Sequence, residues 1–393
     1  MKIAFEAYLH ISLKGRDRLA TARARTQGGT VKAAVVDAAG AGFKISEVEL
    51  AQPQGREVLI DVRASGLCHT DLTIATQDVG VFPMPVLCGH EVAGMVADTG
   101  PQVTEFQAGD RVAACLVQSC GTCAVCLAGR PYQCPRGAML MRGADQAPRI
   151  TRAGEPITQA FGLGGFAAQA LIHENQLVKI HAETPFPQAA LLGCGVVTGA
   201  GAVLNTARVR PGDTVAIIGA GGVGLNAVTA ASLVGAARII AIDIHDATLQ
   251  KARRFGATDV INSATTNSVE AVRDLLPGGV DGVFDFVGLG EVTSEALKML
   301  TVGGTLYLIG VSRTDSQVVV NLVDAVLKQP RVVGVNTGSA NFKRDIPLYS
   351  RLYLDGRFEL DALVSAEISL DQIESGYQQL ADPDVSRVVI TRF

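Results

Sequence analysis

Four cysteines close together in the chain have the spacing of a metal site. Cys120, Cys123, Cys126 and Cys134 form the pattern C-x2-C-x2-C-x7-C. Four thiolates without another donor make the tetrahedral site that zinc favours when its role is structural. A chance cluster or a pair of disulfides is the alternative, but cysteines so close in sequence are poorly placed to bridge one another. The pattern therefore predicts a structural zinc ion.

A second set of metal-type residues surrounds this loop and offers only three donors. Cys68 and His90 precede the loop, and Cys194 follows it between two glycines. Two cysteines and one histidine leave the fourth tetrahedral position to water or substrate, which is the arrangement of a catalytic zinc. Each residue alone is weak evidence, because a buried cysteine is usually a core residue. Their order around the four-cysteine loop predicts a catalytic site.

A glycine-rich turn follows a short apolar run at 213–218. The letters GAGGVG match the pattern G-x-G-x-x-G, and the stretch 225–233 after them has the composition of a helix. Such glycines let the backbone approach a pyrophosphate, which the helix N-terminus then binds. The residues predicted to bind the cofactor here are Gly219, Gly221, Gly222, Val223 and Gly224.

A second apolar run, 238–242, ends at Asp243. This lies roughly 20 residues after the turn, where an acidic residue accepts hydrogen bonds from the adenosine ribose hydroxyls. A carboxylate at that place repels the 2′-phosphate of NADP. The predicted cofactor is NAD.

The elements that must position these residues change character along the chain. Residues 31–196 contain both cysteine sets and consist of short alternating runs, such as 57–62, separated by glycine and proline. From 197 to 337, strand-like runs alternate with helical segments, the pattern of a parallel sheet. Residues 338–393 end in another strand-like run at 387–390. No internal repeat or low-complexity linker interrupts the chain.

These elements in this order, over about 31–393, resemble the zinc-dependent medium-chain alcohol dehydrogenases, with most similarity to the liver-type and class III branch. The stretches 109–112, 193–201 and 303–305 are similar to that family as well. The resemblance implies an α/β protein. A GroES-like, β-rich catalytic domain (31–196 and 338–393) would be split around a doubly wound Rossmann domain (197–337).

The resemblance also implies the reaction. Zinc held by Cys68, His90 and Cys194 lowers the pKa of an alcohol, and the alcohol carbon transfers a hydride to NAD. The hydroxyl of Thr70 takes the substrate proton toward the cofactor ribose. A helix N-cap would also explain a threonine at this position, and both can be true.

Further residues take roles from the same resemblance. Asp71 is expected to hold the second nitrogen of the histidine ligand, and Glu91 to lie beneath the catalytic zinc. His69 and Arg387 are expected to bind the NAD pyrophosphate, although His69 could also be a solvent-exposed loop residue.

Two departures from the family pattern bear on the chemistry. Thr73 stands where liver-type enzymes carry a histidine that ends the proton path, so the path is expected to end at the ribose or at water. Class III enzymes hold glutathione with an acidic residue and an arginine. Near the matching places this chain has Gln77, Asp78 and Val79, and Ala138 between Arg136 and Arg142.

The substrate is therefore expected to be a primary alcohol with an aryl, terpenoid or longer alkyl tail. Leu116, where the family often has an aromatic residue, fits an apolar pocket. The alternative is a glutathione-dependent formaldehyde dehydrogenase, in which Arg136 or Arg142 could serve.

Composition excludes other classes of protein. The chain has 393 residues, 48% of them hydrophobic, and a net charge of −4. An acidic protein of this kind is not expected to bind nucleic acid or an anionic membrane. A zinc-binding regulatory module would also leave the glycine-rich turn and Asp243 unexplained.

No apolar stretch long enough to span a membrane is expected. Eight cysteines in metal-type clusters or apolar runs suit a reduced cytoplasm.

Residues 1–30 lie outside the resemblance. The segment is rich in arginine and poor in acidic residues, so a transit peptide is one possibility. The preferred interpretation is a dispensable extension or a mis-set start. The family resemblance further implies a homodimer or homotetramer, formed when strands at 331–335 pair across a two-fold axis.

Overall fold

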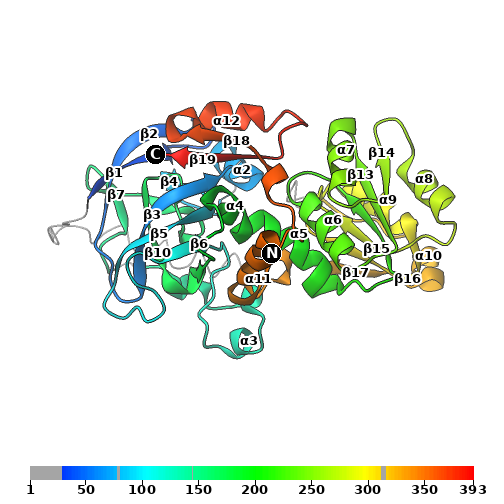
Figure 1. Ribbon diagram of the computed structural model, residues 1–393, viewed down its shortest axis with the longest axis horizontal. Coiled ribbons are helices and arrows are strands. Elements are labelled where there is room, and N and C mark those ends of the chain that lie inside the picture. Colours follow the sequence, from blue (N-terminus) through cyan, green and yellow to red (C-terminus); the bar gives the residue numbers. More distant parts are fainter. Residues whose placement is uncertain (1–28, 78–79, 144, 311–315) are drawn as a thin grey trace.

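The computed structural model describes residues 29–77, 80–143, 145–310 and 316–393. The extension predicted for 1–30 therefore falls almost wholly outside the described residues, as do Asp78 and Val79. Three sheets organise the described chain, two in the β-rich part and one in the part that contains the glycine-rich turn (Figure 1).

The first β-rich sheet has six strands. Its order is β8 (Glu155–Pro156), β7 (Ile150–Arg152), β2 (Lys44–Leu50), β1 (Thr30–Val36), β4 (Val86–Leu87) and β9 (Thr158–Gln159). The second has seven strands. Six of them follow the order β11 (Leu177–Lys179), β6 (Arg111–Ala114), β5 (Glu91–Thr99), β3 (Glu57–Gly66), β19 (Arg387–Arg392) and β18 (Val364–Ser369), and the seventh, β10 (Gln169–His173), also pairs with β3.

The second sheet joins the two ends of the chain. Strand β19 pairs antiparallel with β3, and Val389 lies opposite Gly66. This pairing brings Arg387, at the start of β19, close to the loop that carries Cys68 after β3. Long-range strand pairing thus returns the C-terminal segment to the sheet built by the N-terminal half. The domain boundaries proposed from the sequence remain predictions.

The third sheet is parallel throughout its six strands. Its order is β14 (Asp259–Asn262), β13 (Arg238–Asp243), β12 (Thr214–Ile218), β15 (Val280–Asp285), β16 (Leu300–Leu308) and β17 (Arg331–Gly334). Numbered along the chain this is 3-2-1-4-5-6, the order of the doubly wound dinucleotide-binding fold. The helices that connect these strands are α6 (Gly224–Leu233), α7 (Asp246–Arg254), α8 (Ser268–Leu275), α9 (Gly290–Met299) and α10 (Leu322–Lys328). The predicted fold class is confirmed.

Short helices complete the β-rich part. They are α2 (His69–Thr76), α3 (Ala124–Leu127), α11 (Phe342–Leu354) and α12 (Ile373–Gln379). Helix α3 lies in the four-cysteine loop, which protrudes at the bottom of the view in Figure 1.

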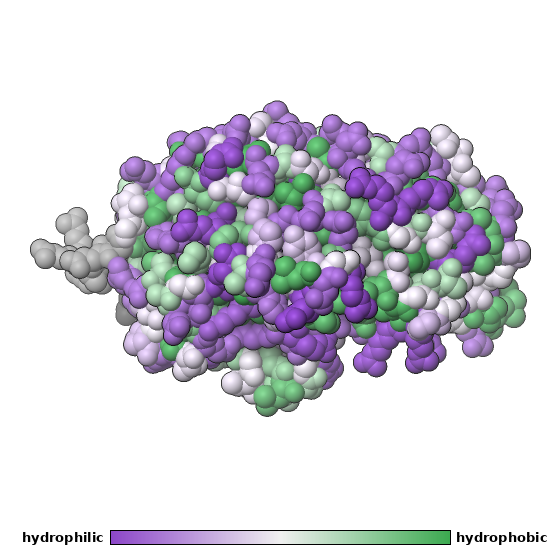
Figure 2. Space-filling view, in the orientation of Figure 1, coloured by the Kyte–Doolittle hydropathy of each residue, from purple (hydrophilic) through white to green (hydrophobic). Residues whose placement is uncertain are grey.

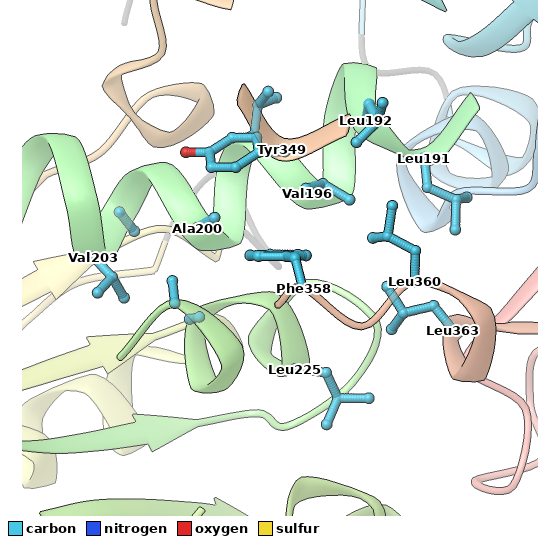
Figure 3. Packing of buried hydrophobic residues seen from close by; sticks show 14 of the residues in the cluster. Leu191, Leu192, Val196, Ala200, Val203, Leu225, Tyr349, Phe358, Leu360 and Leu363 are labelled. Carbon is cyan, nitrogen blue, oxygen red and sulfur yellow. The ribbon is translucent and has the colours of Figure 1, made fainter. Parts of the chain in front are cut away.

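One long helix connects the two parts of the molecule. It runs through α4 (Phe186–Leu191), a π-helical turn η5 (Leu192–Val196), α5 (Val197–Gly201) and a second π-helical turn η6 (Ala202–Ala207). Figure 3 shows its apolar side chains, among them Leu192 and Val196, packed near Tyr349 of α11 and Phe358. Wide π-turns of this kind occur often at functional sites, and η5 contains Cys194.

This helix contradicts the expectation that the chain contains no apolar segment of spanning length. By length and composition the 22-residue helix Phe186–Ala207 could cross a membrane. However, 78% of its most apolar window is buried inside the protein. The apolar run is not apparent in the sequence because glycines interrupt it, and the helix accommodates these glycines.

Candidate active site and metal centres

The three donors of the predicted catalytic site meet although they are far apart in sequence. Cys68 caps α2 after strand β3, His90 precedes β5, and Cys194 lies in the π-turn η5. The ligand atoms of Cys68, His90, Glu91 and Cys194 all lie within 4.8 Å of one another and are buried. Nε2 of His90 is 3.2 Å from Sγ of Cys194. Tetrahedral zinc with ordinary bond lengths separates such a pair by about 3.6 Å, so the donors fit the ion.

Asp71 holds the histidine from behind. Its Oδ2 lies 2.9 Å from Nδ1 of His90, and its Oδ1 accepts a hydrogen bond from the backbone N–H of Gly89 at 2.9 Å. Both Asp71 and His90 have no exposed surface. A carboxylate at Nδ1 keeps the proton there, so that Nε2 points its lone pair at the cluster. The structure thus places Asp71 where its predicted role requires it.

The charge state of this cluster suits a cation. A hydrogen bond with Cys194 lowers the pKa of Cys68 well below its ordinary value, although burial opposes the shift, and the same contact raises the pKa of Cys194. Burial lowers the pKa of His90, but the charges of Asp71 and Cys68 outweigh burial and raise it well above its ordinary value, so a metal ion would take the place of the proton on Nε2. A buried thiolate is therefore already favoured, and a metal ion requires thiolate donors.

Behind the cluster lies a second buried carboxylate, that of Glu91. Burial raises the pKa of Glu91 to about 7, against the effect of the Arg387 charge. The Nε of Arg387 is 3.7 Å from Oε1 of Glu91. The guanidinium also lies against Gly222, where a Cβ atom would come within 2.2 Å of Nη1. Arg387 therefore contacts both the metal cluster and the glycine-rich turn, and Gly222 leaves the space it needs.

The four-cysteine loop closes as predicted. All four sulfurs lie within 4.8 Å of one another. Sγ of Cys123 is 3.5 Å from that of Cys126 and 3.9 Å from that of Cys134. Four sulfurs around zinc at ~2.3 Å would lie about 3.8 Å apart. The backbone N–H groups of Cys120 and Arg136 donate to the Cys134 sulfur.

Local backbone groups also favour thiolates in this loop. The backbone N–H of Thr122 makes the largest contribution in lowering the pKa of Cys120 to about 6. The backbone N–H of Cys126 likewise lowers the pKa of Cys123, whereas burial raises the pKa of Cys126 to about 12. The donor set and its spacing fit a tetrahedral zinc ion.

The glycine-rich turn connects β12 to α6 in the predicted manner. Gly219 has the left-handed φ of 84°, which lets the chain turn sharply after the strand. A Cβ atom at Gly221 would meet nothing within 4 Å, so this glycine faces open space. Asp243 ends β13, and its carboxylate accepts hydrogen bonds from the backbone N–H groups of Ala220 at 2.9 Å and His245 at 3.1 Å. The acidic residue is thus fixed beside the turn.

A single cleft of ≈ 1020 Å³ joins the two predicted sites. Its lining includes the predicted residues Cys68, His69, Thr70, Thr73, Leu116, Cys194, Gly219, Gly221, Gly222, Val223, Gly224, Asp243 and Arg387. His90, Glu91 and Asp71 lie buried behind this lining. The position of Thr70 excludes the alternative of a helix N-cap, because α2 begins at His69 and Cys68 occupies the cap position. The hydroxyl of Thr73 donates to the backbone oxygen of His69 at 3.0 Å.

Phe161 is a residue of the cleft that the sequence argument missed. It adopts a left-handed conformation with φ 54°, which is uncommon for a bulky side chain and is found most often at functional sites. Its ring lies 5.4 Å from the His90 ring and 5.1 Å from the Phe82 ring, centroid to centroid. The feature of the sequence that could have indicated Phe161 is its position as a lone aromatic residue in a glycine-rich stretch (160–165).

The structure removes Arg142 from the candidate glutathione site. Its Nε and Nη2 donate to the two carboxylate oxygens of Glu57 at 2.9 and 2.6 Å, and its side chain is only 7% exposed. Glu57 also pairs with the buried Arg149. Within the described chain, the cleft lining includes neither Arg136 nor Arg142. The interpretation of Arg142 as a residue that could hold glutathione is therefore wrong.

Comparison with known proteins agrees with this architecture. Residues 54–182 match the family model described as alcohol dehydrogenase GroES-like domain, and residues 222–351 match that described as zinc-binding dehydrogenase. The NDMA-dependent alcohol dehydrogenase of Amycolatopsis methanolica is 37% identical over 365 residues, which cover 91% of this chain and 98% of that protein.

Two solved structures extend the comparison. The benzyl alcohol dehydrogenase of Acinetobacter calcoaceticus is 34% identical with a TM-score of 0.86, covering 93% of this chain and 100% of that one. A putative zinc-binding dehydrogenase of Sinorhizobium meliloti, bound to NADP, is 26% identical with a TM-score of 0.76, covering 92% and 99%.

The fold and the two cysteine clusters together define a two-part, zinc-binding dehydrogenase. The chain belongs to the family of zinc-dependent medium-chain alcohol dehydrogenases.

Proposed function

We propose that this protein oxidises primary alcohols to aldehydes with hydride transfer to NAD, and catalyses the reverse reaction. The observation that carries the proposal is the shared cleft, in which Cys68 and Cys194 lie at one end and the turn with Asp243 lies at the other. A substrate bound near the cysteines and a dinucleotide on the turn would meet in the same space. A substrate and a dinucleotide are the two reactants of an alcohol dehydrogenase.

The residues of the cleft have separate tasks in this reaction. When bound, zinc supplies the Lewis acidity that favours loss of the alcohol proton, and NAD supplies the hydride acceptor. Thr70, exposed in the cleft, accepts and passes on the hydroxyl proton. Asp71 orients His90, and the buried Arg387 presents positive charge beside the turn.

The choice of NAD over NADP rests on Asp243. A 2′-phosphate on the ribose would bring negative charge against this carboxylate, which the backbone of Ala220 and His245 holds in place. The Sinorhizobium meliloti structure contains NADP, and the Amycolatopsis methanolica relative depends on NDMA. Neither property is assigned to this chain, and both define controls for the assay.

The expected substrate has an apolar tail. The side chains of Leu116, Phe161, Phe286 and Ile309 line the cleft. Burial of apolar surface stabilises a bound tail by about 25 cal/mol per Å², and ethanol has little such surface. The benzyl alcohol dehydrogenase among the related structures points to the same class of substrate.

The decisive assay measures NADH formation by the zinc-loaded protein with benzyl alcohol, geraniol, hexanol and ethanol. Formaldehyde is tested with and without glutathione. NADP replaces NAD in one arm, and NDMA is added as an acceptor in another. Turnover of the bulky alcohols with NAD supports the proposal. Activity only with formaldehyde and glutathione would assign the protein to the class III reaction instead.

We further propose that two copies of the chain associate through the β17 edge of the parallel sheet. In the described residues β17 pairs only with β16, so its other side offers free backbone groups. Helix α10, which contacts the neighbouring strand β16, exposes Leu322 (80%) and Val326 (72%) to solvent. Figure 2 shows hydrophobic colour at the right of the molecule, the side on which α10 lies in Figure 1. An edge strand and an apolar helix face suit self-association across a two-fold axis.

Sedimentation analysis of Val326→Glu tests the proposed dimer. The variant is expected to have half the mass of the parent assembly, or less. The matched control is Leu127→Glu, because Leu127 is as exposed (76%) but lies in the four-cysteine loop. An unchanged mass for Val326→Glu would refute this interface.

The eight free cysteines also lead us to propose a reduced, cytoplasmic setting.

A further inference from the structure

A loop of the β-rich part crosses to the parallel-sheet part and lines the cleft. Residues 380–386 connect α12 to β19, and in Figure 1 this segment extends from α12 toward α7. The backbone oxygen of Pro383 accepts hydrogen bonds from Nζ of Lys251 at 3.2 Å and from Oγ1 of Thr248 at 3.4 Å. Nζ of Lys251 also donates to Oγ of Ser386 at 3.4 Å. We call these four residues the clasp.

Electrostatic attraction supports the clasp. The loop carries Asp382 and Asp384, whereas Lys251 and Arg254 lie on the facing helix α7. Burial lowers the pKa of Lys251, and the two loop carboxylates act in the opposite direction because they stabilise its charged form. Opposite charges on the two sides of the cleft therefore hold the loop against α7.

The clasp lies at the dinucleotide end of the cleft. All four of its residues contribute to the cleft lining, as do Gly221 and Asp243. One side of the clasp is anchored through β19 to the β-rich sheet, and the other through α7 to the parallel sheet. A molecule on the turn beside Asp243 is thus bordered by a bridge between the two parts of the protein.

We propose that the clasp is the gate through which the dinucleotide cofactor binds and leaves. This inference rests on the proposed function, because it takes NAD to be the ligand of the cleft. The clasp bonds must break before the cofactor passes in either direction and form again afterwards. They therefore raise the barrier to association and dissociation alike, while the equilibrium affinity stays nearly unchanged.

Stopped-flow measurement of NADH binding to the zinc-loaded protein tests the gate. In Lys251→Met two of the three clasp hydrogen bonds are lost, so both the association and the dissociation rate constants should rise by about threefold to tenfold. Ser386→Ala removes one bond and should change both rates in the same direction by a smaller factor. High salt should act on the parent protein as these substitutions do, because it screens the loop carboxylates from Lys251.

The control is Lys298→Met, since Lys298 is an exposed lysine of α9 paired with Glu295 outside the cleft. It should leave both rates unchanged. A faster dissociation with unchanged association in Lys251→Met would identify Lys251 as a direct cofactor ligand and overturn the gate, as would unchanged rates. If the parent protein binds no NADH at all, the proposed function fails, and the gate fails with it.

Discussion

Replacing Asp71 by asparagine tests how the catalytic metal site is held together. In the structure Oδ1 of Asp71 accepts from the Gly89 N–H, and Oδ2 faces Nδ1 of His90 at 2.9 Å. The amide oxygen of an asparagine must take the place beside Gly89, because that partner is a donor. Its NH2 group then faces Nδ1, which must become an acceptor. The proton of a neutral His90 moves to Nε2, the nitrogen that points at Cys194.

This change removes a metal donor without changing the size of the side chain. A protonated Nε2 cannot coordinate zinc, and loss of such a supporting carboxylate typically weakens metal affinity by about 10- to 100-fold. That corresponds to about 1.4 to 2.7 kcal/mol. The fold should persist, because the hydrogen bond to Gly89 is kept and the replaced side chain fits the same space.

The assay is competition for zinc between the protein and a chromophoric chelator, read together with the zinc content after dialysis. About half of the bound zinc, that of the catalytic site, should be lost from Asp71→Asn. Asp345→Asn is the matched control, because Asp345 is equally buried (1% exposed) but pairs with Arg344 and Asn205 away from both metal centres. Unchanged zinc affinity in Asp71→Asn, or an equal loss in Asp345→Asn, would refute the reasoning.

Three further predictions follow from other contacts. Glu57→Gln leaves the buried Arg149 without its counter-charge and should lower the free energy of unfolding by about 3–5 kcal/mol in urea titrations; a loss below 1 kcal/mol would contradict this. Burial acts to raise the pKa of Glu57, but the arginines lower it overall. The contribution of Glu57 to the free energy of unfolding is therefore full above about pH 4.3 and is lost as the pH falls through the lower folded pKa. The free energy of unfolding should accordingly fall less on acidification in the variant than in the parent protein. Asp243→Ser should raise kcat/KM with NADP relative to NAD, and an unchanged ratio would remove Asp243 from cofactor choice. Thr73→His should restore rate at low pH more than Thr73→Ala, because only histidine can act as a base there; equal profiles would show that the relay ends elsewhere.

Much of the fold follows from local pattern in the sequence. Continuous apolar runs predicted strands that the structure shows at β12 and β13, with ends that differ by a single residue. The run of glycines at 219–224 predicted the turn before α6, because its close spacing has few other structural explanations. The four-cysteine loop was readable for the same reason, since all its donors lie within one short segment.

The catalytic cluster required the resemblance to a known family as well. Cys68, His90 and Cys194 come from three separate segments, and no local periodicity indicates that their side chains meet. The pairing of β3 with β5 and the π-turn η5 bring them together. The roles of Thr70, His69 and Arg387 remain predictions that their places in the cleft now make testable.

The sequence by itself determined the element types, the four-cysteine donor set and the dinucleotide turn, because each is encoded by residues that are neighbours in the chain. Only the tertiary structure decided that Arg142 pairs with Glu57, that the apolar helix 186–207 is buried in the core, and that Lys251 meets Pro383 across the cleft. Such contacts join residues tens to hundreds of positions apart. They depend on how sheets and helices pack, which charge and hydrophobicity along the chain do not specify.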